Sequence, residues 1–187
     1  MNVYDFDGTI YKGDSSVDLI KMLIFKKPIK SFPYLFKFLG AVIKYKRKKI
    51  KKEEMKENFF AIFSLFDNRE DIIKEFWDKH QHKLKDYYYK QKRDDDVIIS
   101  ASPEFNISYI SNKLGVKCIA SKLNLDTLKY EGLNCHGPEK INRFVKEFGT
   151  TDVIDKFYSD SHYDIPLAKC AKEAYLVKGN KINKWIL

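Results

Sequence analysis

Cysteine is scarce in this sequence, and long apolar runs are absent. The three cysteines, Cys118, Cys135 and Cys170, include no Cys-x-x-Cys pair, so we expect free, buried thiols in a reducing cytosol. The most apolar stretch, residues 32–43, is about a dozen residues long and carries Lys37, whereas a helix that spans a bilayer needs about 20 residues. Because the chain opens on an apolar run that leads into the acidic motif, we expect no targeting segment ahead of it. We therefore expect a cytoplasmic protein without a membrane span.

The sequence also lacks a glycine-rich nucleotide-binding loop, an internal repeat and a low-complexity tract. Its hydrophobic content of 44% and aromatic content of 15% predict a folded protein and argue against disorder. A chain of 187 residues can bury one good core, with room for a second small module.

Positive charge is concentrated in one part of the chain. The formal net charge is +9, and the segment from Lys21 to Phe60 holds 13 Lys and Arg against 3 Glu, so the remainder sums to about −1. This segment is either a solvated helix face or a surface for an anionic partner. The aromatic-rich run 32–45 directly precedes the basic run 47–52, which is an interfacial pattern. Among anionic partners we therefore expect peripheral contact with an anionic membrane and do not expect nucleic acid.

Apolar residues recur at spacings of three and four from residue 17 to about residue 92, which predicts helices. Asp14 and the two serines after it supply an N-cap for the first. We expect four helical runs, with Pro28 and Pro33 separating the first two: residues 17–24, 34–45, 53–65 and 69–88.

Short β-branched runs alternate with helical stretches in the remainder of the chain. Together with the opening residues they predict a doubly wound, Rossmann-like parallel sheet, an α/β core of residues 1–13 and 94–187. An all-α helical-bundle cap, residues 14–93, is inserted into it. We expect a small hairpin over 125–133, helices over 103–114, 137–148 and 165–171, and strands over 97–100, 116–120, 153–158 and 174–177.

Two carboxylates, Asp5 and Asp7, stand two residues apart where the first apolar run gives way to Gly8 and Thr9. In an extended strand, side chains at i and i+2 share a face, so both could converge on one spot. Close carboxylates repel, and they are stable together when a hard cation lies between them or when they divide nucleophilic and acid–base work. The alternative is a plain acidic turn after a strand.

Three more predicted strands or loops end in polar residues: Ser100-Ala101-Ser102, Gly137-Pro138-Glu139-Lys140, and Asp160 to Asp164. In this order the four motifs resemble those of the haloacid dehalogenase superfamily of phosphohydrolases. The Asp-Ser-x-x-Asp-x-Pro-Leu spelling of residues 160–167 and the early helical insert resemble the phosphoserine phosphatase-like branch. Taken singly, each of these residues could also have an ordinary structural role, as part of a turn, a helix cap or a solvated side chain.

The resemblance implies that Asp5 is the nucleophile, which would form an aspartyl-phosphate, and that Asp7 is the general acid and base. Lys140 would neutralise Asp5 and a phosphate oxygen. Positive charge is needed because a phosphate dianion repels an anionic nucleophile. The phosphate-binding groups would be Thr9, Ser100 and the backbone amides around Ala101.

The resemblance also implies Mg²⁺ as the cofactor. Asp5, the carbonyl of Asp7 and Asp160 would hold the ion, and Asp164 would ligate directly or orient a bound water. Asp14 would select the substrate, since the related phosphatases carry a glutamate there.

Three departures from the branch leave the substrate open. Ser159 replaces a glycine, Ala101-Ser102 replaces a glycine pair, and Tyr163 replaces an asparagine. We expect a magnesium-dependent phosphatase acting on a small-molecule phosphate ester. The alternatives are a phosphatase of a phosphorylated lipid headgroup at the membrane surface, and a phosphotransferase that uses the same aspartyl-phosphate.

Overall fold

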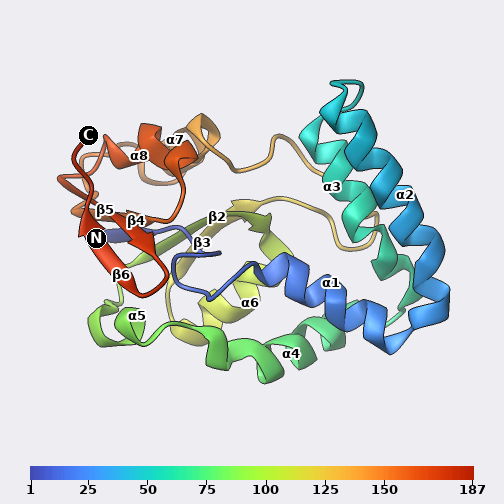
Figure 1. Cartoon of the computed structure of the whole chain (residues 1–187). Coiled ribbons are helices and arrows are strands. Elements are labelled where there is room, and N and C mark those ends of the chain that lie inside the picture. Colours follow the sequence, from blue (N-terminus) through green and yellow to red (C-terminus); the bar gives the residue numbers. More distant parts are fainter.

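Six strands form a single sheet, in the spatial order β3-β2-β1-β4-β5-β6, in the computed structural model, which describes residues 1–187 (Figure 1). The first five strands pair in parallel, and β6 pairs antiparallel with β5 at one edge. The expected α/β, Rossmann-like fold is confirmed. Because β1 lies between β2 and β4, its carboxyl end opens at the middle of the sheet, where doubly wound folds bind ligands. The strands are β1 (Asn2–Tyr4), β2 (Val97–Pro103), β3 (Lys117–Ser121), β4 (Lys156–Ser159), β5 (Glu173–Lys178) and β6 (Lys181–Lys184).

The sheet is buried on both faces by side chains that alternate along the strands. On one face Tyr4 packs in a large apolar cluster that also holds Trp77 and Tyr88 from the helical segment. On the other face Val3 packs in a second cluster with Phe144 from α7. These two layers fix the ends of the central strands in place.

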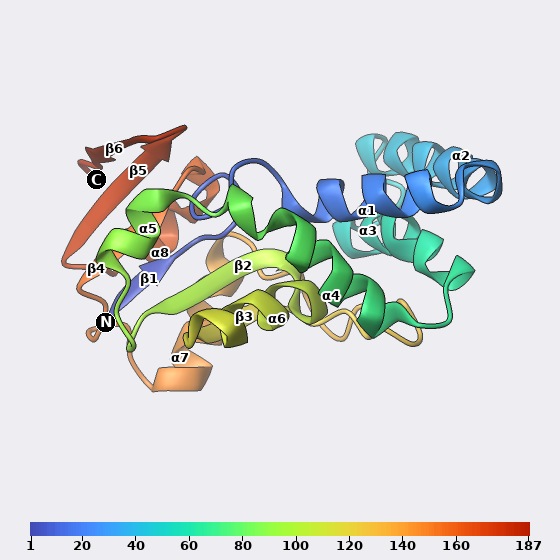
Figure 2. The same ribbon diagram turned by 90° about the horizontal axis from the view of Figure 1, so that it is seen from below.

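The helical segment between β1 and β2 divides into an outer and an inner part. Helices α1 to α3 extend from one side of the sheet, whereas α4 runs along it beside α6 (Figures 1 and 2). The indole Nε1 of Trp77 in α4 donates to the carbonyl of Asn106 in α6 at 2.8 Å. Since α4 and α5 share one apolar cluster with the sheet, the division into a 14–93 cap and a core stays a prediction. The helices are α1 (Ser15–Lys26), α2 (Pro28–Lys46), α3 (Lys52–Phe60), α4 (Arg69–His80), α5 (Asp86–Gln91), α6 (Glu104–Leu114), α7 (Pro138–Phe148) and α8 (Ile165–Ala168).

The prediction that Pro33 separates two helices is wrong. Helix α2 begins with Pro28 at its first position, where proline is well accommodated, and continues through Pro33. A proline inside a helix removes one hydrogen bond to the carbonyl four residues earlier. That carbonyl belongs to Ile29, which is exposed, so water can satisfy it.

The predicted helix 69–88 is also wrong as a single element. Helix α4 ends at His80, and a 3₁₀ turn follows over Gln81–Lys83 before α5 begins. Between the two, Lys85 donates its backbone N–H to the carbonyl of Ile10 at 2.8 Å. Pairing with the loop after β1 therefore outweighs local helical periodicity here.

Several element ends differ from the sequence-based expectations. Strand β4 starts three residues later than expected, and helix α8 ends at Ala168 after a 3₁₀ turn over His162–Asp164. The expected hairpin over 125–133 is reduced to one antiparallel bridge between Leu123 and Tyr130. Strand β6 was not expected, because its polar residues show no apolar alternation.

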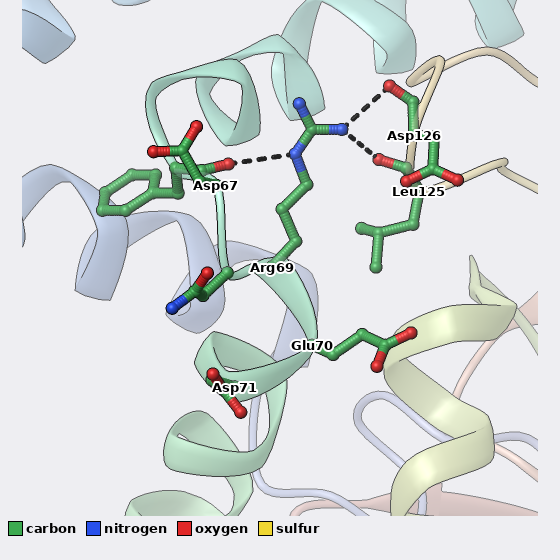
Figure 3. Close-up of a pocket in the computed structure, with 8 residues that line it drawn as sticks. Asp67, Arg69, Glu70, Asp71, Leu125 and Asp126 are labelled. Atoms are coloured by element: carbon green, nitrogen blue, oxygen red, sulfur yellow. Dashed lines mark hydrogen bonds between the residues drawn. The ribbon is translucent and has the colours of Figure 1, made fainter.

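A cavity of about 620 Å³ lies between the start of α4 and the loop after β3. The guanidinium of Arg69 crosses it, donating through Nη1 to the carbonyls of Leu125 and Asp126 at 2.5 and 2.8 Å (Figure 3). Its Nε donates to the carbonyl of Phe66 at 3.2 Å. None of the predicted site residues lines this cavity, so Arg69 acts as a brace between α4 and the loop.

All three cysteines are free, with Cys135 buried and the other two half-buried. No helix of the structure is both long enough and apolar enough to cross a bilayer. The expected cytoplasmic location stays a prediction.

Candidate active site

The four sequence motifs meet at the carboxyl edge of the sheet. Asp5 follows β1, Ser100 lies in β2, Asp160 follows β4, and Lys140 lies in the first turn of α7. The backbone N–H of Asp5 donates to the carbonyl of Tyr158 in β4 at 2.8 Å. The sheet therefore holds the first acidic residue in register with the last motif.

Lys140 joins two carboxylates in the interior of the protein. Its Nζ lies 2.7 Å from Oδ1 of Asp5 and 2.7 Å from Oδ2 of Asp164. The lysine is only 1% exposed, Asp164 2% and Asp5 8%. A buried ammonium is stable only when it is paired in this way, so all three side chains are held at one place.

Charge and burial oppose each other in this triad. Burial alone would lower the pKa of Lys140, but Asp5 and Asp164 raise it above the ordinary lysine value, so the ammonium stays charged. Burial raises the pKa of Asp5 to about 7; Lys140 opposes this rise, while Asp164 and Asp160 add to it. The single positive charge of Lys140 therefore does not neutralise the carboxylates around it, so a further cation bound beside Asp5 would be favourable.

Ser159, which stands where the phosphatases that the sequence resembles carry a glycine, has a definite structural role. Its hydroxyl donates to Oδ2 of Asp164 at 2.7 Å and accepts the backbone N–H of Ser161 at 3.0 Å. Asp164 is therefore fixed by Ser159 and Lys140 together. This geometry fits the orienting role for Asp164 better than direct metal ligation.

Asp7 is held by different partners from those of Asp5. Its Oδ1 accepts the backbone N–H of Ser15 at 2.6 Å, and its Oδ2 accepts the hydroxyl of Ser102 at 2.5 Å. Burial, with a contribution from Asp14, raises the pKa of Asp7 to about 6. A carboxyl that titrates near neutrality can donate a proton and later accept one.

The expectation that Asp5 and Asp7 converge because they share a face of a strand is wrong. Strand β1 ends at Tyr4, before either carboxylate. The N–H groups of Ile10 and Tyr11 both donate to the carbonyl of Phe6, so the chain is already turning between the two acids. Each carboxylate instead meets its own set of hydrogen-bond partners.

The turn after Asp7 packs tightly against the last motif. Gly8 has φ +74°, and a Cβ at this position would lie 2.0 Å from Oδ2 of Asp160. The hydroxyl of Thr9 accepts the backbone N–H of Asp160 at 2.9 Å. The ammonium of Lys85 donates to the carbonyls of Gly8 and Gly179. Thr9 therefore positions the Asp160 loop, and whether it also supports a phosphate stays a prediction.

Replacing Gly8 by alanine should disrupt this packing. We expect the turnover of a phosphate ester to fall by at least about tenfold, since the new methyl group would displace the Asp160 carboxylate. The positive φ adds a strain of about 1–2 kcal/mol. Gly115→Ala is the matched control, because Gly115 has φ +70° and nothing within 4 Å of the added Cβ. If both variants keep parental turnover while losing similar stability, the contact between Gly8 and Asp160 has no role in catalysis.

The second motif lines the opposite side of the site. The hydroxyl of Ser100, which is buried, accepts the backbone N–H of Ser102 at 3.1 Å. Ser102 links this motif to the first through Asp7 and contacts Ser16 at 2.9 Å. Asp14, predicted to select the substrate, is exposed and caps α1 through the backbone N–H of Val17 at 2.9 Å. Its substrate role stays a prediction.

Lys56 is a site residue that the sequence did not reveal. It lies in α3, yet its ammonium donates to the carbonyl of Ala101 and to Oδ1 of Asn134, both at 2.8 Å. Burial lowers its pKa to about 8, with a further contribution from Lys52, while Asp14 and Asp7 oppose the shift. In the sequence it is one lysine among many in a basic segment, so no local signal distinguishes it.

The role of the predicted metal ligands stays a prediction. No group of three or more His, Cys, Asp or Glu side chains is placed to hold a metal ion. A site built from Asp5, Asp160 and the carbonyl of Asp7 needs only two acidic side chains. Burial and the nearby Asp164 raise the pKa of Asp160, while a hydrogen bond from its own backbone N–H and the nearby lysines oppose the rise. These oxygen donors fit a hard cation such as Mg²⁺.

The fold and this edge of the sheet together define a class of protein: a Rossmann-like fold with an aspartate directly after its first strand. The family model for haloacid dehalogenase-like hydrolase matches residues 3–169. The chain belongs to this family, which confirms the recognition made from its motifs and the expected enzyme class of haloacid dehalogenase-type phosphohydrolase. No curated protein sequence matches the chain significantly.

Solved structures share the fold at low sequence identity. A protein with unknown function from Bordetella pertussis Tohama I is 16% identical, with a TM-score of 0.70 over 93% of this chain and 87% of that one. A probable phosphoserine phosphatase from Vibrio cholerae is 10% identical, with a TM-score of 0.61 over 92% and 55%. A phosphoserine phosphohydrolase-like protein from Francisella tularensis is 20% identical, with a TM-score of 0.53 over 93% and 86%. At these identities the likeness concerns the fold alone.

Proposed function

We propose that the protein is a magnesium-dependent phosphatase that hydrolyses a phosphate monoester through an aspartyl-phosphate on Asp5. The observation that carries the proposal is the buried ammonium of Lys140, which contacts Asp5 at 2.7 Å. A carboxylate can attack a phosphate dianion only where positive charge offsets the repulsion between them. Two of the solved structures that share the fold, those from Francisella tularensis and Vibrio cholerae, are described as phosphoserine phosphatase-like. This supports phosphate esters as the substrate class.

The family resemblance and the contacts together support a role for each protein group. Asp5 attacks phosphorus, and the bond to the leaving oxygen breaks while Asp7 gives that oxygen a proton. Asp7, now ionised, takes a proton from the water that hydrolyses the aspartyl-phosphate. Ser102 and the N–H of Ser15 orient Asp7 for both steps. Bound Mg²⁺ would supply additional positive charge at the phosphate oxygens, held by Asp5, Asp160 and the carbonyl of Asp7.

Removal of magnesium should abolish the activity. We expect hydrolysis of an aryl phosphate by the purified chain to stop with excess EDTA and to return when Mg²⁺ is added, because the carboxylates at the site exceed the charge of Lys140. The measurement is the release of the aryl alcohol over time. Asp160→Asn should raise the Mg²⁺ concentration for half-maximal rate by at least about tenfold. Full activity in EDTA would refute the metal requirement.

Lys56 points to a substrate with a second anionic group. Its ammonium is held at the Ala101 carbonyl, beside the motif expected to bind phosphate, and its pKa responds to both Asp7 and Asp14. Burial lowers the pKa of this lysine to about 8, and a second anion on the substrate would raise that pKa and hold the ammonium fully charged. Lys56 from α3 therefore gives the helical segment a direct part in substrate selection.

A Lys56→Met enzyme should separate binding from chemistry. We expect KM to rise at least about tenfold for phosphate esters that carry an additional carboxylate or phosphate, because one charge-assisted contact of about 1.5–3 kcal/mol is lost. For an uncharged aryl group, kcat/KM should change by less than about threefold. Lys146→Met, on the exposed surface of α7, is the matched control. An equal loss on both substrate types would assign Lys56 a structural role instead.

A second candidate function is hydrolysis of a phosphorylated lipid headgroup. The exposed apolar face of α2 favours it, since that face offers a way to reach substrates in a membrane. The two candidate functions are distinguished by assaying phosphorylated lipids in mixed micelles and, separately, their water-soluble headgroup phosphates. A lipid phosphatase hydrolyses the phosphorylated lipids at the higher kcat/KM.

A further inference from the structure

Helix α2 exposes a row of large apolar side chains to solvent. Ile29 is 83% exposed and Phe36 is 69% exposed. The exposed residues follow one another at spacings of three and four, so they lie on one face of the helix. We call this row the apolar stripe: Ile29, Phe32, Phe36, Leu39 and Ile43.

The opposite face of α2 packs against the rest of the protein. Phe38 packs against Phe59 of α3, with ring centroids 4.8 Å apart and the ring planes tilted by 48°. The hydroxyl of Tyr34 accepts the hydroxyl of Ser64 at 2.8 Å, and Ala41 is buried. The apolar stripe is therefore not part of the core, and Figures 1 and 2 show α2 as the outermost element at that end of the molecule.

A stripe of this kind is unusual on a soluble surface. Single exposed apolar residues are common, whereas contiguous rows of them mark contact with another apolar phase or molecule. The two phenylalanines in the stripe are the strongest part of this signal, because each buries a large area when it is covered.

Unpaired positive charge lies along one side of the apolar stripe and beyond its C-terminal end. Lys30, Lys37 and Lys44 repeat every seven residues and so form a line along the helix beside the stripe. No Asp or Glu occurs between residues 19 and 52. None of the exposed basic residues from Lys30 to Lys51 takes part in a salt bridge; we call them the basic rim: Lys30, Lys37, Lys44, Lys46, Arg47, Lys48, Lys49 and Lys51.

The apolar stripe and the basic rim together indicate the chemistry of the partner. We propose that α2 docks on an anionic phospholipid membrane, with the apolar stripe among the acyl chains and the basic rim on the headgroup phosphates. Interfacial helices of peripheral proteins combine one apolar face with flanking Lys and Arg in this way. A second copy of this chain is a poor occupant, because the two basic rims would face each other.

Docking through α2 would place the membrane next to elements that are packed against the active site. Helix α2 packs on α3 through Phe38 and Phe59, and α3 carries Lys56 to Ala101. The proposal does not rest on phosphatase activity, since membrane binding needs no turnover.

Co-sedimentation with vesicles tests the proposal. We expect the parent protein to bind vesicles of equal parts phosphatidylglycerol and phosphatidylcholine at least about tenfold more tightly than vesicles of phosphatidylcholine alone, and to bind less at high salt. The variant Phe32→Ser/Phe36→Ser should bind the anionic vesicles at least about tenfold more weakly. The variant Lys30→Gln/Lys37→Gln/Lys44→Gln should lose most of the preference for anionic lipid.

Controls separate docking from misfolding and self-association. Ile186→Ser removes an apolar side chain that is 94% exposed near the C-terminus, and it should bind as the parent does. All variants should keep the parental melting temperature, because the changed side chains are exposed. The proposal is overturned if the parent binds neither vesicle, or if the phenylalanine variant binds as well as the parent. It is also overturned if the parent is a dimer in sedimentation that does not bind lipid, and the phenylalanine variant is a monomer.

Discussion

Phosphatase turnover is expected to fall by at least about 10³-fold when Asp5 is replaced by asparagine, while the fold is retained. Asparagine keeps the shape of the side chain but is a far weaker nucleophile towards phosphorus. Asp164 remains to pair with Lys140 at 2.7 Å, so the buried ammonium is not left alone. The measurement is the rate of aryl phosphate hydrolysis together with the thermal melting curve.

Asp152→Asn is the matched control for this substitution, because Asp152 is exposed and its side chain makes no ion pair. It should keep the parental rate. A rate for Asp5→Asn within about tenfold of the parent, which is less than about 1.4 kcal/mol of barrier, would show that Asp5 is not the nucleophile.

The second large effect is expected for Lys140→Met. Loss of the ammonium leaves two carboxylates, Asp5 and Asp164, buried without their partner. We expect a loss of about 3–5 kcal/mol in the free energy of unfolding near neutral pH, and a fall in turnover of at least about 10²-fold. Chemical denaturation in EDTA measures the first quantity, and the aryl phosphate assay measures the second.

The stability loss in Lys140→Met should depend on pH with a definite sign. The pKa of Asp5 is raised to about 7 even beside the lysine, and removal of the lysine raises it further. A carboxyl whose folded pKa exceeds its unfolded value destabilises the protein as pH rises through those values. The difference from the parent should therefore shrink as pH falls from about 8 to about 5. Lys146→Met, an exposed change on the same helix, should show neither effect; a pH-independent loss in Lys140→Met would contradict the pairing.

Local patterns in the sequence were sufficient to predict the sheet and the motifs at its edge. The β-branched run 97–100 and the alternation of strand and helix after it correspond to β2, α6 and β3. Gly137 and Pro138 mark the start of α7, and Lys140 in its first turn was singled out through the resemblance to the haloacid dehalogenase motifs; its catalytic role stays a prediction. These features are encoded within a few residues of one another, so sequence reasoning can reach them.

What could not be predicted depends on contacts between distant segments. The break after His80 arises from pairing of Leu84 with Tyr11, which no local signal specifies. Lys56 reaches Ala101 across 45 positions of the chain, and Ser102 reaches Asp7 across 95. The exposure of the apolar stripe is likewise a property of how α2 packs, since its residues alone would also suit a buried helix.

Trapping the covalent intermediate tests the central claim most directly. An acyl phosphate, unlike a carboxylate, is reduced by borohydride to an alcohol, so an aspartyl-phosphate at position 5 would be converted to homoserine. The parent protein is mixed with Mg²⁺ and an aryl phosphate, quenched with borohydride, digested and sequenced by mass spectrometry. We expect homoserine at position 5, only when both substrate and Mg²⁺ are present. An unmodified Asp5 under turnover, or homoserine at position 7 instead, would contradict the assignment of Asp5 as the nucleophile.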